Sequence, residues 1–528
     1  MASTSGQMSE ENLTTEGWGK QVANFIKEKR ICKAKLKTSS YHYHLNKFKK
    51  RPDRLWLNNS IRAHFKIKNG PKVFNDPIHG TMEIHPLLVT IIDTPQFQRL
   101  RHIKQLGGTY YVFPGASHNR FEHSIGVSHL AGEFLKTLKS NQPELNITER
   151  DILCVQIAGL CHDLGHGPFS HLFDDMFTPK LKQHNPAAAQ IIGDWTHEKA
   201  SLLMFDHMVD VNGLEPVMEQ YGLELPDDCE FIKEMIGGPP DDGQYVCRPN
   251  DKAFLYEIVA NKTNGIDVDK FDYFARDCYH LGIKANFDHR RLFMFSRVMK
   301  VDGKMHICFR DKEVNNLYDM FHTRICIHRA CKHKVTMSIQ MMITDALLKA
   351  DVQLHLSTAF HNPEAYTKLT DQVFEEILRS TSYRLKEARE ILERLVCRDL
   401  YKLVGEAKLK HQPGREISQG MIGSLEEELE GLGGDTEVIV VPFDYGMNDD
   451  DPIANSYFYR KNNGDQAFKM SPDQMSGLPP QRFSEKILRV YWKSPDVDRL
   501  EDVKRQFQTW CPRNGFQLLF GDRVQPEA

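Results

Sequence analysis

Apolar residues recur every three or four positions along most of the first four hundred residues, which is the spacing of one face of a helix. A helix start is also marked where Thr94 precedes Pro95, because Thr is a good cap and Pro suits the first turn. The segments that this spacing predicts to be helical are residues 94–106, 121–140, 150–163, 196–210, 252–275, 311–350 and 363–405. We expect them to form one helical domain over residues 71–405.

Beyond residue 436 the pattern changes to runs of β-branched and aromatic residues, which favour strands. Strands are predicted over residues 437–445, 456–460 and 486–492, with a helix packed on them over residues 499–511. They give a small α+β lobe over residues 437–520, joined to the helical domain by a Gly-, Lys- and Glu-rich connector, residues 406–436, and followed by a loose tail, residues 521–528. The predicted fold class is mainly α, with a large all-helical core and a small α+β C-terminal lobe.

The composition narrows the class of protein. Of 528 residues, 40% are hydrophobic and 26% are charged, which is typical of a globular chain and excludes whole-chain disorder, collagen and a simple coiled coil. The longest nearly apolar run, residues 152–161, is too short to cross a bilayer, and polar residues 1–15 lack the apolar segment of a secretory signal. No membrane partner is therefore expected. Eleven scattered cysteines without a CxxC pair predict reduced thiols.

Charge is distributed unevenly along the chain. The net charge is −3, so the chain as a whole is not expected to bind nucleic acid non-specifically. Residues 1–70 are nevertheless expected to form a basic and in part disordered arm, in which basic residues are densest at residues 47–52. One interpretation is a solvated arm without a specific role. The other is a nuclear-import signal or a patch for single-stranded nucleic acid, which makes the nucleus, with the cytoplasm second, the expected location.

The densest group of potential metal ligands lies in residues 161–171, which read CHDLGHGPFSH. Imidazole and carboxylate groups side by side are common ligands of transition metals. The glycines and the proline of this string end the preceding helix, which leaves the later histidines free to project into a cleft. Residues 117–124 and 265–277 can supply further ligands, although either segment can equally be a salt-bridged helix face.

His123, the His162–Asp163 pair and Asp269 match the H…HD…D ligand pattern of the HD-domain metal phosphohydrolases. The strings NDPIH, PGASHNRFEH, HDLGHGPFSH and DVDKFDYFARD, within residues 75–277, extend the match. They closely resemble the vertebrate SAM-and-HD-domain deoxynucleoside triphosphate triphosphohydrolases, and the resemblance covers residues 70–515. Residues 1–70 are short and basic, so the sterile-alpha-motif domain of that family is not expected here.

The resemblance implies hydrolysis of a dNTP to a deoxynucleoside and inorganic triphosphate. It implies that a divalent transition metal (Zn, Fe or Mn) binds at His123, His162, Asp163 and Asp269, and that Mg²⁺ joins through the nucleotide. His171 is the expected general acid, oriented by Asp174, with His166 and His197 beside it, although His197 can also be a capping or core histidine. The substrate residues that the resemblance implies are Gln105 and Leu106 at the deoxyribose, Asp277 at its 3′-hydroxyl, and Arg120, Lys270, Tyr273 and Arg324 at the triphosphate.

Because the family is an allosteric homotetramer, the resemblance also implies activation by GTP at one site and by a dNTP at a second, with control of the dNTP pool and restriction of viral replication. The residues that match the GTP site are Lys72, Val73, Asp93, Gln98 and Arg101. Those that match the dNTP site are Asn75, Val112, Phe113, Arg291, Arg310, Lys312, Asn316, His333, Lys334 and Lys493. Without the resemblance, Asp93 and Arg101 are ordinary polar residues of an amphipathic helix.

The chain departs from the family within residues 322–334, where it is one residue shorter, and Cys331 stands about where a tyrosine near the sugar is found. One residue less turns the rest of a helix by about 100°. Either a local bulge absorbs this rotation or the pocket wall is altered, which bears on His333 and Lys334.

Two other functions remain open. The first is an HD phosphodiesterase or nuclease that acts on a nucleic acid or a cyclic nucleotide, and the many nucleotide-contacting residues argue against it. The second is a nucleic-acid-binding or scaffold protein whose catalysis has decayed. The complete set of metal ligands and His171 argue against decay, so a dNTP triphosphohydrolase is the leading interpretation.

Overall fold

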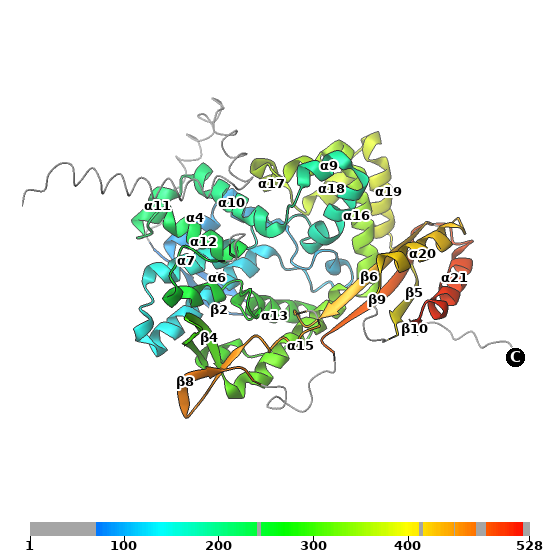
Figure 1. Ribbon diagram of the computed structural model, residues 1–528. Coiled ribbons are helices and arrows are strands. Elements are labelled where there is room, and N and C mark those ends of the chain that lie inside the picture. The colour runs from blue at the N-terminus through cyan, green and yellow to red at the C-terminus, as the bar shows by residue number, and fades with distance from the viewer. Residues whose placement is uncertain are drawn as a thin grey trace, which may run out of the picture. The chain divides into compact units, whose positions relative to one another are not determined.

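The computed structural model describes residues 70–239, 244–410, 416–433, 435–447, 449–470 and 482–520 (Figure 1). The predicted arm up to residue 69, its basic segment 47–52 and the tail 521–528 lie outside these residues. Helices dominate the described part, and strands form three small sheets, so the predicted fold class is confirmed. No helix in this part combines the length and the apolar character that a bilayer crossing requires.

The α-helices of the described part are α4 (Pro86–Ile92), α5 (Pro95–Gln98), α6 (Arg120–Asn141), α7 (Glu149–Cys161), α8 (Thr178–His184), α9 (Pro186–Ile192), α10 (His197–Asn212), α11 (Glu215–Gln220), α12 (Asp227–Gly237), α13 (Val268–Leu281), α14 (His289–Met294), α15 (Val314–Cys331), α16 (Lys334–Leu354), α17 (Pro363–Lys368), α18 (Gln372–Arg379), α19 (Lys386–Val396), α20 (Gln419–Glu430) and α21 (Leu500–Arg513). The short 3₁₀ turns are η1 (Arg99–His102), η2 (Gly107–Tyr111), η3 (Pro143–Leu145), η5 (Asn250–Glu257), η6 (Asp311–Glu313), η7 (Leu356–Ala359) and η8 (Tyr383–Leu385), and η4 (Phe173–Phe177) is a π-helical turn. The strands are β1 (Lys72–Asp76), β2 (Gly80–Ile84), β3 (Ser296–Val301), β4 (Lys304–Arg310), β5 (Lys402–Leu409), β6 (Thr436–Asp444), β7 (Tyr457–Arg460), β8 (Asn463–Phe468), β9 (Ser484–Trp492) and β10 (Phe516–Phe520).

Helices α6, α7 and α13 carry, or end next to, the residues predicted to bind the metal. Each begins with a cap that its own sequence supplies. The backbone amide of Asn119 donates to Glu122 at the start of α6, and the Thr148 hydroxyl accepts from the Asp151 amide at the start of α7. Asp267 caps α13. Helix α6 packs against both α7 and α13. Asp269 in the first turn of α13 lies close to both His123 in the first turn of α6 and His162 at the end of α7, so these three helix ends meet.

Four predicted helices are interrupted in the structure. The helix predicted over residues 94–106 divides into α5 and η1 and ends at His102. The helix predicted over residues 252–275 is replaced by η5, a loop and α13, because side chains such as Asn261 and Asn264 bond to backbone groups inside the loop. The helix predicted over residues 311–350 breaks between α15 and α16. The segment 363–405 divides into α17, α18, η8, α19 and the start of β5.

The strands after residue 401 belong to two sheets rather than to one lobe. One sheet has the order β10–β5–β9–β6 and is antiparallel throughout. The other has the order β3–β4–β7–β8, so β7, predicted in the lobe, pairs in parallel with β4. The predicted connector, residues 406–436, contains the end of β5, α20 and the start of β6. Gly405 was not predicted to lie in a strand. A Cβ atom added there would lie 2.5 Å from the Phe507 ring, so the absence of a side chain at Gly405 allows α21 to pack closely on β5.

Two clusters of buried apolar side chains hold the described part together. The larger lies among the helices, and α6 and α7 contribute heavily to it. The smaller lies where α20 and α21 cover the sheet of β5, β6, β9 and β10, and it includes Trp492, Phe507 and Trp510. The cysteines of the described part carry free thiols, as predicted.

Candidate functional site

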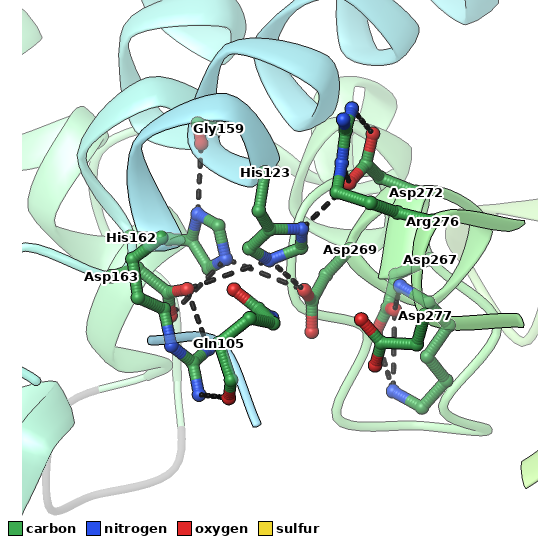
Figure 2. A network of polar contacts seen from close by, with 12 residues as sticks. Gln105, His123, Gly159, His162, Asp163, Asp267, Asp269, Asp272, Arg276 and Asp277 are labelled. Carbon is green, nitrogen blue, oxygen red and sulfur yellow. Dashed lines mark hydrogen bonds and ion pairs between the residues drawn. The ribbon is translucent and has the colours of Figure 1, made fainter. Parts of the chain in front are cut away.

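The predicted metal ligands meet where α6, α7 and α13 approach one another (Figure 2). The donor atoms of His123, His162 and Asp269 all lie within 4.8 Å of one another. Asp269 Oδ1 is 3.1 Å from His123 Nε2 and 3.3 Å from His162 Nε2. Asp163 completes the group, with one oxygen 3.4 Å from His123 Nε2 and the other 3.3 Å from His162 Nε2. Ligands at about 2.0 Å from a tetrahedral metal are about 3.3 Å apart, so these spacings fit a metal centre.

The orientation of the two imidazoles supports the same conclusion. His123 Nε2 and His162 Nε2 are buried, and neither has a hydrogen-bond partner among the described residues. Their other nitrogens are engaged, since His123 Nδ1 lies 2.7 Å from Asp272 Oδ2 and His162 Nδ1 lies 2.8 Å from the Gly159 carbonyl oxygen. Both Nε2 lone pairs are therefore left for a cation.

The electrostatics of this group favour a cation as well. Burial alone would lower the pKa of His123, but the carboxylates of Asp269 and Asp272 outweigh burial and raise that pKa to about 10. Asp163 adds further negative charge. A divalent metal fits this excess of carboxylate over cationic groups, and the nitrogen and oxygen donors are the types that transition metals prefer.

Asp272 orients His123 through its Nδ1 atom, and Arg276 in turn binds Asp272. Neither residue was predicted to belong to the site. Arg276 donates from Nε and Nη2 to the two oxygens of Asp272, each at 2.8 Å, as Figure 2 shows. Asp272 also lies 2.6 Å from His79 Nε2. The spacing of three residues between Asp269 and Asp272 places both on one face of α13, so the signal was present in the sequence.

A second group of side chains lies next to the metal-ligand candidates. It consists of His166, His171, Asp174 and His197, whose donor atoms also lie within 4.8 Å of one another. Asp174 Oδ2 is 2.8 Å from His197 Nδ1, 3.5 Å from His166 Nδ1 and 3.8 Å from His171 Nδ1. Asp174 therefore lies closer to His197 than to His171, which was predicted as its partner. It lies on the π-helical turn η4, an irregularity that is frequent at functional sites.

The environments of these groups differ. His197 stacks on His166 with ring centroids 4.2 Å apart, and Thr196 rather than His197 caps α10. The side chain of His171 is 60% exposed, whereas that of Asp174 is 10% exposed. Desolvation within the site, followed by the positive charges of Arg120 and His197, lowers the pKa of His171. Burial raises the pKa of Asp174.

Asp163 and His166 join the two groups. His166 Nε2 lies 3.3 Å from Asp163 Oδ1, and Asp163 Oδ2 accepts a hydrogen bond from Arg120 Nη1 at 2.7 Å. Arg120 also donates from Nε to the Ser170 hydroxyl at 3.0 Å. Arg120, predicted to bind phosphate, thus also fixes a candidate metal ligand and the residue before His171.

The other predicted phosphate-binding cations are each paired with a carboxylate. Lys270 Nζ lies 3.2 Å from Asp267, and Arg324 Nη2 lies 3.4 Å from Asp444. Arg324 Nε is buried and has no hydrogen-bond partner in the part of the chain that is described. Tyr273 lies beside His123, with ring centroids 6.3 Å apart. These cations can exchange their carboxylates for an anionic ligand.

His328 and Lys332 lie on or next to α15, the helix that carries Arg324, and neither was predicted to belong to the site. Burial and the positive charges of Arg324 and Lys332 lower the pKa of His328 to about 2, and His171 contributes to this shift. His328 is four residues from Arg324, so helical spacing on α15 could have placed it on the same face.

The predicted sugar-binding residues are mostly shielded from solvent. Gln105 is buried, and its Oε1 atom lacks a hydrogen-bond partner among the described residues. Leu106 is half-buried. Asp277 Oδ1 lies 2.6 Å from His118 Nε2, so one carboxylate oxygen is engaged by the protein.

The predicted GTP residues lie on β1 and around α4, α5 and η1. Lys72, Val73 and Arg101 are exposed, and Asp93 is the C-cap of α4. Arg101 donates to the Gln98 side chain at 2.8 Å.

The predicted dNTP residues are only partly brought together by contacts within one chain. Arg291 and Asn316 both contact Glu313, at 2.7 and 3.2 Å, and Lys312 Nζ lies 3.5 Å from the centroid of the Phe295 ring, which Arg291 also approaches. Arg310 pairs with Asp311, and the Phe113 ring lies 6.4 Å from that of His333. Asn75 and Lys334 are exposed, and Val112 is half-buried. Lys493 is paired with Asp345 at 2.6 Å and Glu437 at 3.4 Å.

A helical fold that brings an H…HD…D ligand set to one point defines an HD-domain protein, and residues 120–235 match the family model described as the HD domain. Relatives named deoxynucleoside triphosphate triphosphohydrolase SAMHD1 match far more of the chain. The protein of Danio rerio is 53% identical over 90% of this chain and 79% of its own length. Those of Gallus gallus and Homo sapiens are 54% and 51% identical, each over 86% of this chain and over 77% and 76% of their own lengths. The chain belongs to this SAMHD1 family, which confirms the predicted family.

Proposed function

We propose that this protein is a metal-dependent dNTP triphosphohydrolase, which cleaves a dNTP to a deoxynucleoside and inorganic triphosphate. The observation that carries the proposal is the junction of two groups of side chains through Asp163 and His166. One group has the ligands for a metal, and the other has imidazoles that can move a proton. Membership of the SAMHD1 family supplies the substrate class.

A divalent metal held by His123, His162, Asp163 and Asp269 would supply Lewis acidity at the α-phosphate, where Zn, Fe and Mn all suit the ligands and Mg²⁺ can accompany the triphosphate. The chain's own residues do the rest. Lys270, Arg324 and Tyr273 bind the triphosphate, and its negative charge replaces the carboxylates of Asp267 and Asp444. Binding from several sides holds the α-phosphorus in place for attack by water.

His171 is positioned to donate a proton to the leaving 5′-oxygen. Water adds to the α-phosphorus and loses one proton to solvent, the bond from phosphorus to the 5′-oxygen breaks, and the proton of His171 completes the deoxynucleoside hydroxyl. His171 then regains a proton from solvent, which closes the cycle. The pKa of His171 is lowered before substrate binds, which disfavours the protonated form. The four or so negative charges of a nucleoside triphosphate act in the opposite direction, so substrate binding itself promotes protonation of the general acid.

Selection of deoxyribose over ribose is proposed to occur at Gln105 and Leu106. Gln105 is buried, and a buried amide beside the sugar would disfavour an added 2′-hydroxyl. Asp277 is fixed by His118 through one oxygen, which leaves the other for the 3′-hydroxyl. A buried polar group that must be satisfied by the substrate discriminates strongly.

Regulation is also part of the proposal. GTP at Lys72, Val73, Asp93, Gln98 and Arg101, and a dNTP at the second set of residues, would activate a homotetramer. The exposure of Lys72, Val73 and Arg101 in a single chain supports sites that a neighbouring subunit completes. Activation by dNTP would limit the dNTP pool, and hence viral replication, when that pool is full. Nuclear residence and binding of single-stranded nucleic acid are supported by the basic composition of residues 47–52.

The test is chromatographic product analysis with the full chain. Incubation with dATP and Mg²⁺, with and without GTP, should release deoxyadenosine and triphosphate in a GTP-dependent manner. His171→Ala should abolish release but retain metal, whereas His184→Ala, an exposed histidine on α8, should match the unaltered protein. Release without GTP would contradict the regulatory part. No release from metal-loaded protein would favour the scaffold interpretation.

A further inference from the structure

The second group of the candidate site, His166, His171, Asp174 and His197, has by itself the composition and spacing of a metal site. Three imidazoles and one carboxylate, from His166, His171, His197 and Asp174, place one donor atom each within 4.8 Å of the others. The distances of 2.8, 3.5 and 3.8 Å from Asp174 Oδ2 to the three Nδ1 atoms bracket the edge of about 3.3 Å in a tetrahedral site with bonds near 2.0 Å.

Unpartnered buried atoms point to a cation at this place. Both oxygens of Asp174 and the Nδ1 atom of His166 are buried without a hydrogen-bond partner among the described residues. The nearest atom that could contact this carboxylate is His197 Nδ1, 2.8 Å from Asp174 Oδ2. Buried polar atoms are nearly always satisfied in proteins, so a carboxylate left unsatisfied among three imidazoles favours an ion that contacts all four.

Neighbouring carboxylates hold two of the imidazoles in the tautomer that a metal needs. His166 Nε2 faces Asp163 Oδ1 at 3.3 Å, and His197 Nε2 faces Glu198 Oε1 at 3.6 Å. A proton on each Nε2 leaves the Nδ1 lone pair directed at Asp174. This carboxylate–histidine arrangement is the usual support of metal-bound imidazoles. His171 is 60% exposed, which gives an ion a path from solvent.

We propose that His166, His171, Asp174 and His197 form a second transition-metal site, distinct from the site of His123, His162 and Asp269, and that Zn²⁺ bound there inhibits the enzyme. Three nitrogen donors and one oxygen donor suit Zn²⁺ and disfavour Mg²⁺, which prefers oxygen ligands. Inhibition follows because the ion occupies the lone pairs through which the imidazoles carry protons. The inhibition rests on the proposed function, whereas the binding does not.

The binding test uses the full chain with its resident metal in place. Equilibrium dialysis against Zn²⁺, followed by elemental analysis, should find one equivalent beyond the resident metal. Co²⁺ in the same site should give the intense visible absorption of tetrahedral coordination. His171→Ala, which removes an exposed side chain and is expected to fold, and His197→Ala should each weaken the additional equivalent by at least about 100-fold, since even supporting residues contribute 10–100-fold. His184→Ala is the matched control and should bind as the unaltered protein does.

An unchanged stoichiometry in both His171→Ala and His197→Ala, checked for native circular dichroism, would overturn the site. So would a weak octahedral Co²⁺ spectrum in the unaltered protein. The inhibitory part is measured separately, as dATP hydrolysis against the occupancy of the additional site, and hydrolysis should fall in proportion to occupancy. Hydrolysis that stays constant or rises as the site fills would overturn inhibition alone. If the unaltered protein hydrolyses no dNTP at all, the proposed function fails while the Co²⁺ spectrum still decides the binding.

Discussion

Asp371, at the start of α18, connects two parts of the site that are far apart in the sequence. Its Oδ1 atom accepts a hydrogen bond from the Phe169 amide at 2.6 Å, and its Oδ2 atom accepts one from the Lys104 amide at 2.8 Å. Lys104 precedes Gln105, which we propose to face the sugar, and Phe169 lies two residues before His171. We expect Asp371→Ala to loosen both segments together.

The size of the effect follows from the contacts. A hydrogen bond to a charged group contributes about 1.5–3 kcal/mol. Burial raises the pKa of Asp371 to about 7, so its carboxyl is only partly ionised near neutral pH, and the lower end applies to each of its two bonds. The free energy of unfolding should therefore fall by about 3 kcal/mol. Phe169 and Ser170 also have φ angles of +61° and +57°, which L-residues adopt at a cost of about 1–2 kcal/mol each. Without the carboxylate this strain is free to relax, and a shift of His171 by about 1 Å should lower kcat by about 100-fold.

The assay combines urea denaturation with steady-state hydrolysis of dATP in the presence of GTP. Glu376→Ala, an exposed position on the same helix, is the control and should change neither quantity. Stability within 1 kcal/mol of the unaltered protein, together with an unchanged kcat, would refute the reasoning. A fall in stability with an unchanged kcat would show that Asp371 supports the fold without positioning His171.

Three further predictions concern the same site. Asp272→Asn should weaken metal retention by about 10–100-fold, measured by elemental analysis after a chelator challenge, because His123 loses its orienting carboxylate; equal retention would contradict that role. Gly165→Ala places a Cβ atom 2.0 Å from the His197 carbonyl oxygen, so Tm should fall and hydrolysis should be lost, and a variant of unchanged Tm would show that the helix can move aside at little cost. His197→Gln removes a positive charge that lowers the pKa of His171, so the alkaline limb of the kcat/KM profile against pH should move to higher pH, and a shift to lower pH would have the wrong sign.

Most of the site was predicted from short sequence segments. The H…HD…D residues are recognisable because each sits in a short segment with its own helix cap or helix break. The residues that hold the 164–171 loop have no such signal. Arg99 donates to the carbonyl oxygens of Leu164 and His166, both at 2.9 Å, and the Tyr366 hydroxyl donates to that of Gly165 at 2.7 Å. Because the acceptors are backbone atoms, no residue type in the loop indicates which distant side chain will reach it.

The same limit explains the errors in the fold. Helices with a continuous apolar face were predicted close to their observed bounds, as for α6 and α10. Apolar and polar residues alternate only weakly over residues 402–409. The reason is that β5 lies between two strands and is covered by α21, so both of its faces are partly buried. Assignment of β7 to the sheet of β3 and β4 depends on a parallel pairing across about 150 residues, which no local pattern encodes.

Segment 322–334, which is predicted to be one residue shorter than in the family, contains the junction of α15 and α16. A lost residue rotates only the remainder of the same helix, by about 100° per residue. Helix α15 ends at Cys331, and His333 caps α16 by accepting from the amide two residues on, so the rotation stops between them. Helix α16 takes its position from the C-terminal sheet, where the Tyr491 hydroxyl donates to the Lys334 carbonyl oxygen at 2.8 Å. Burial, and then the charge of Asp277, raise the pKa of the Cys331 thiol to about 12. Because α16 takes its position from the sheet, the register of His333 and Lys334 does not depend on the length of α15.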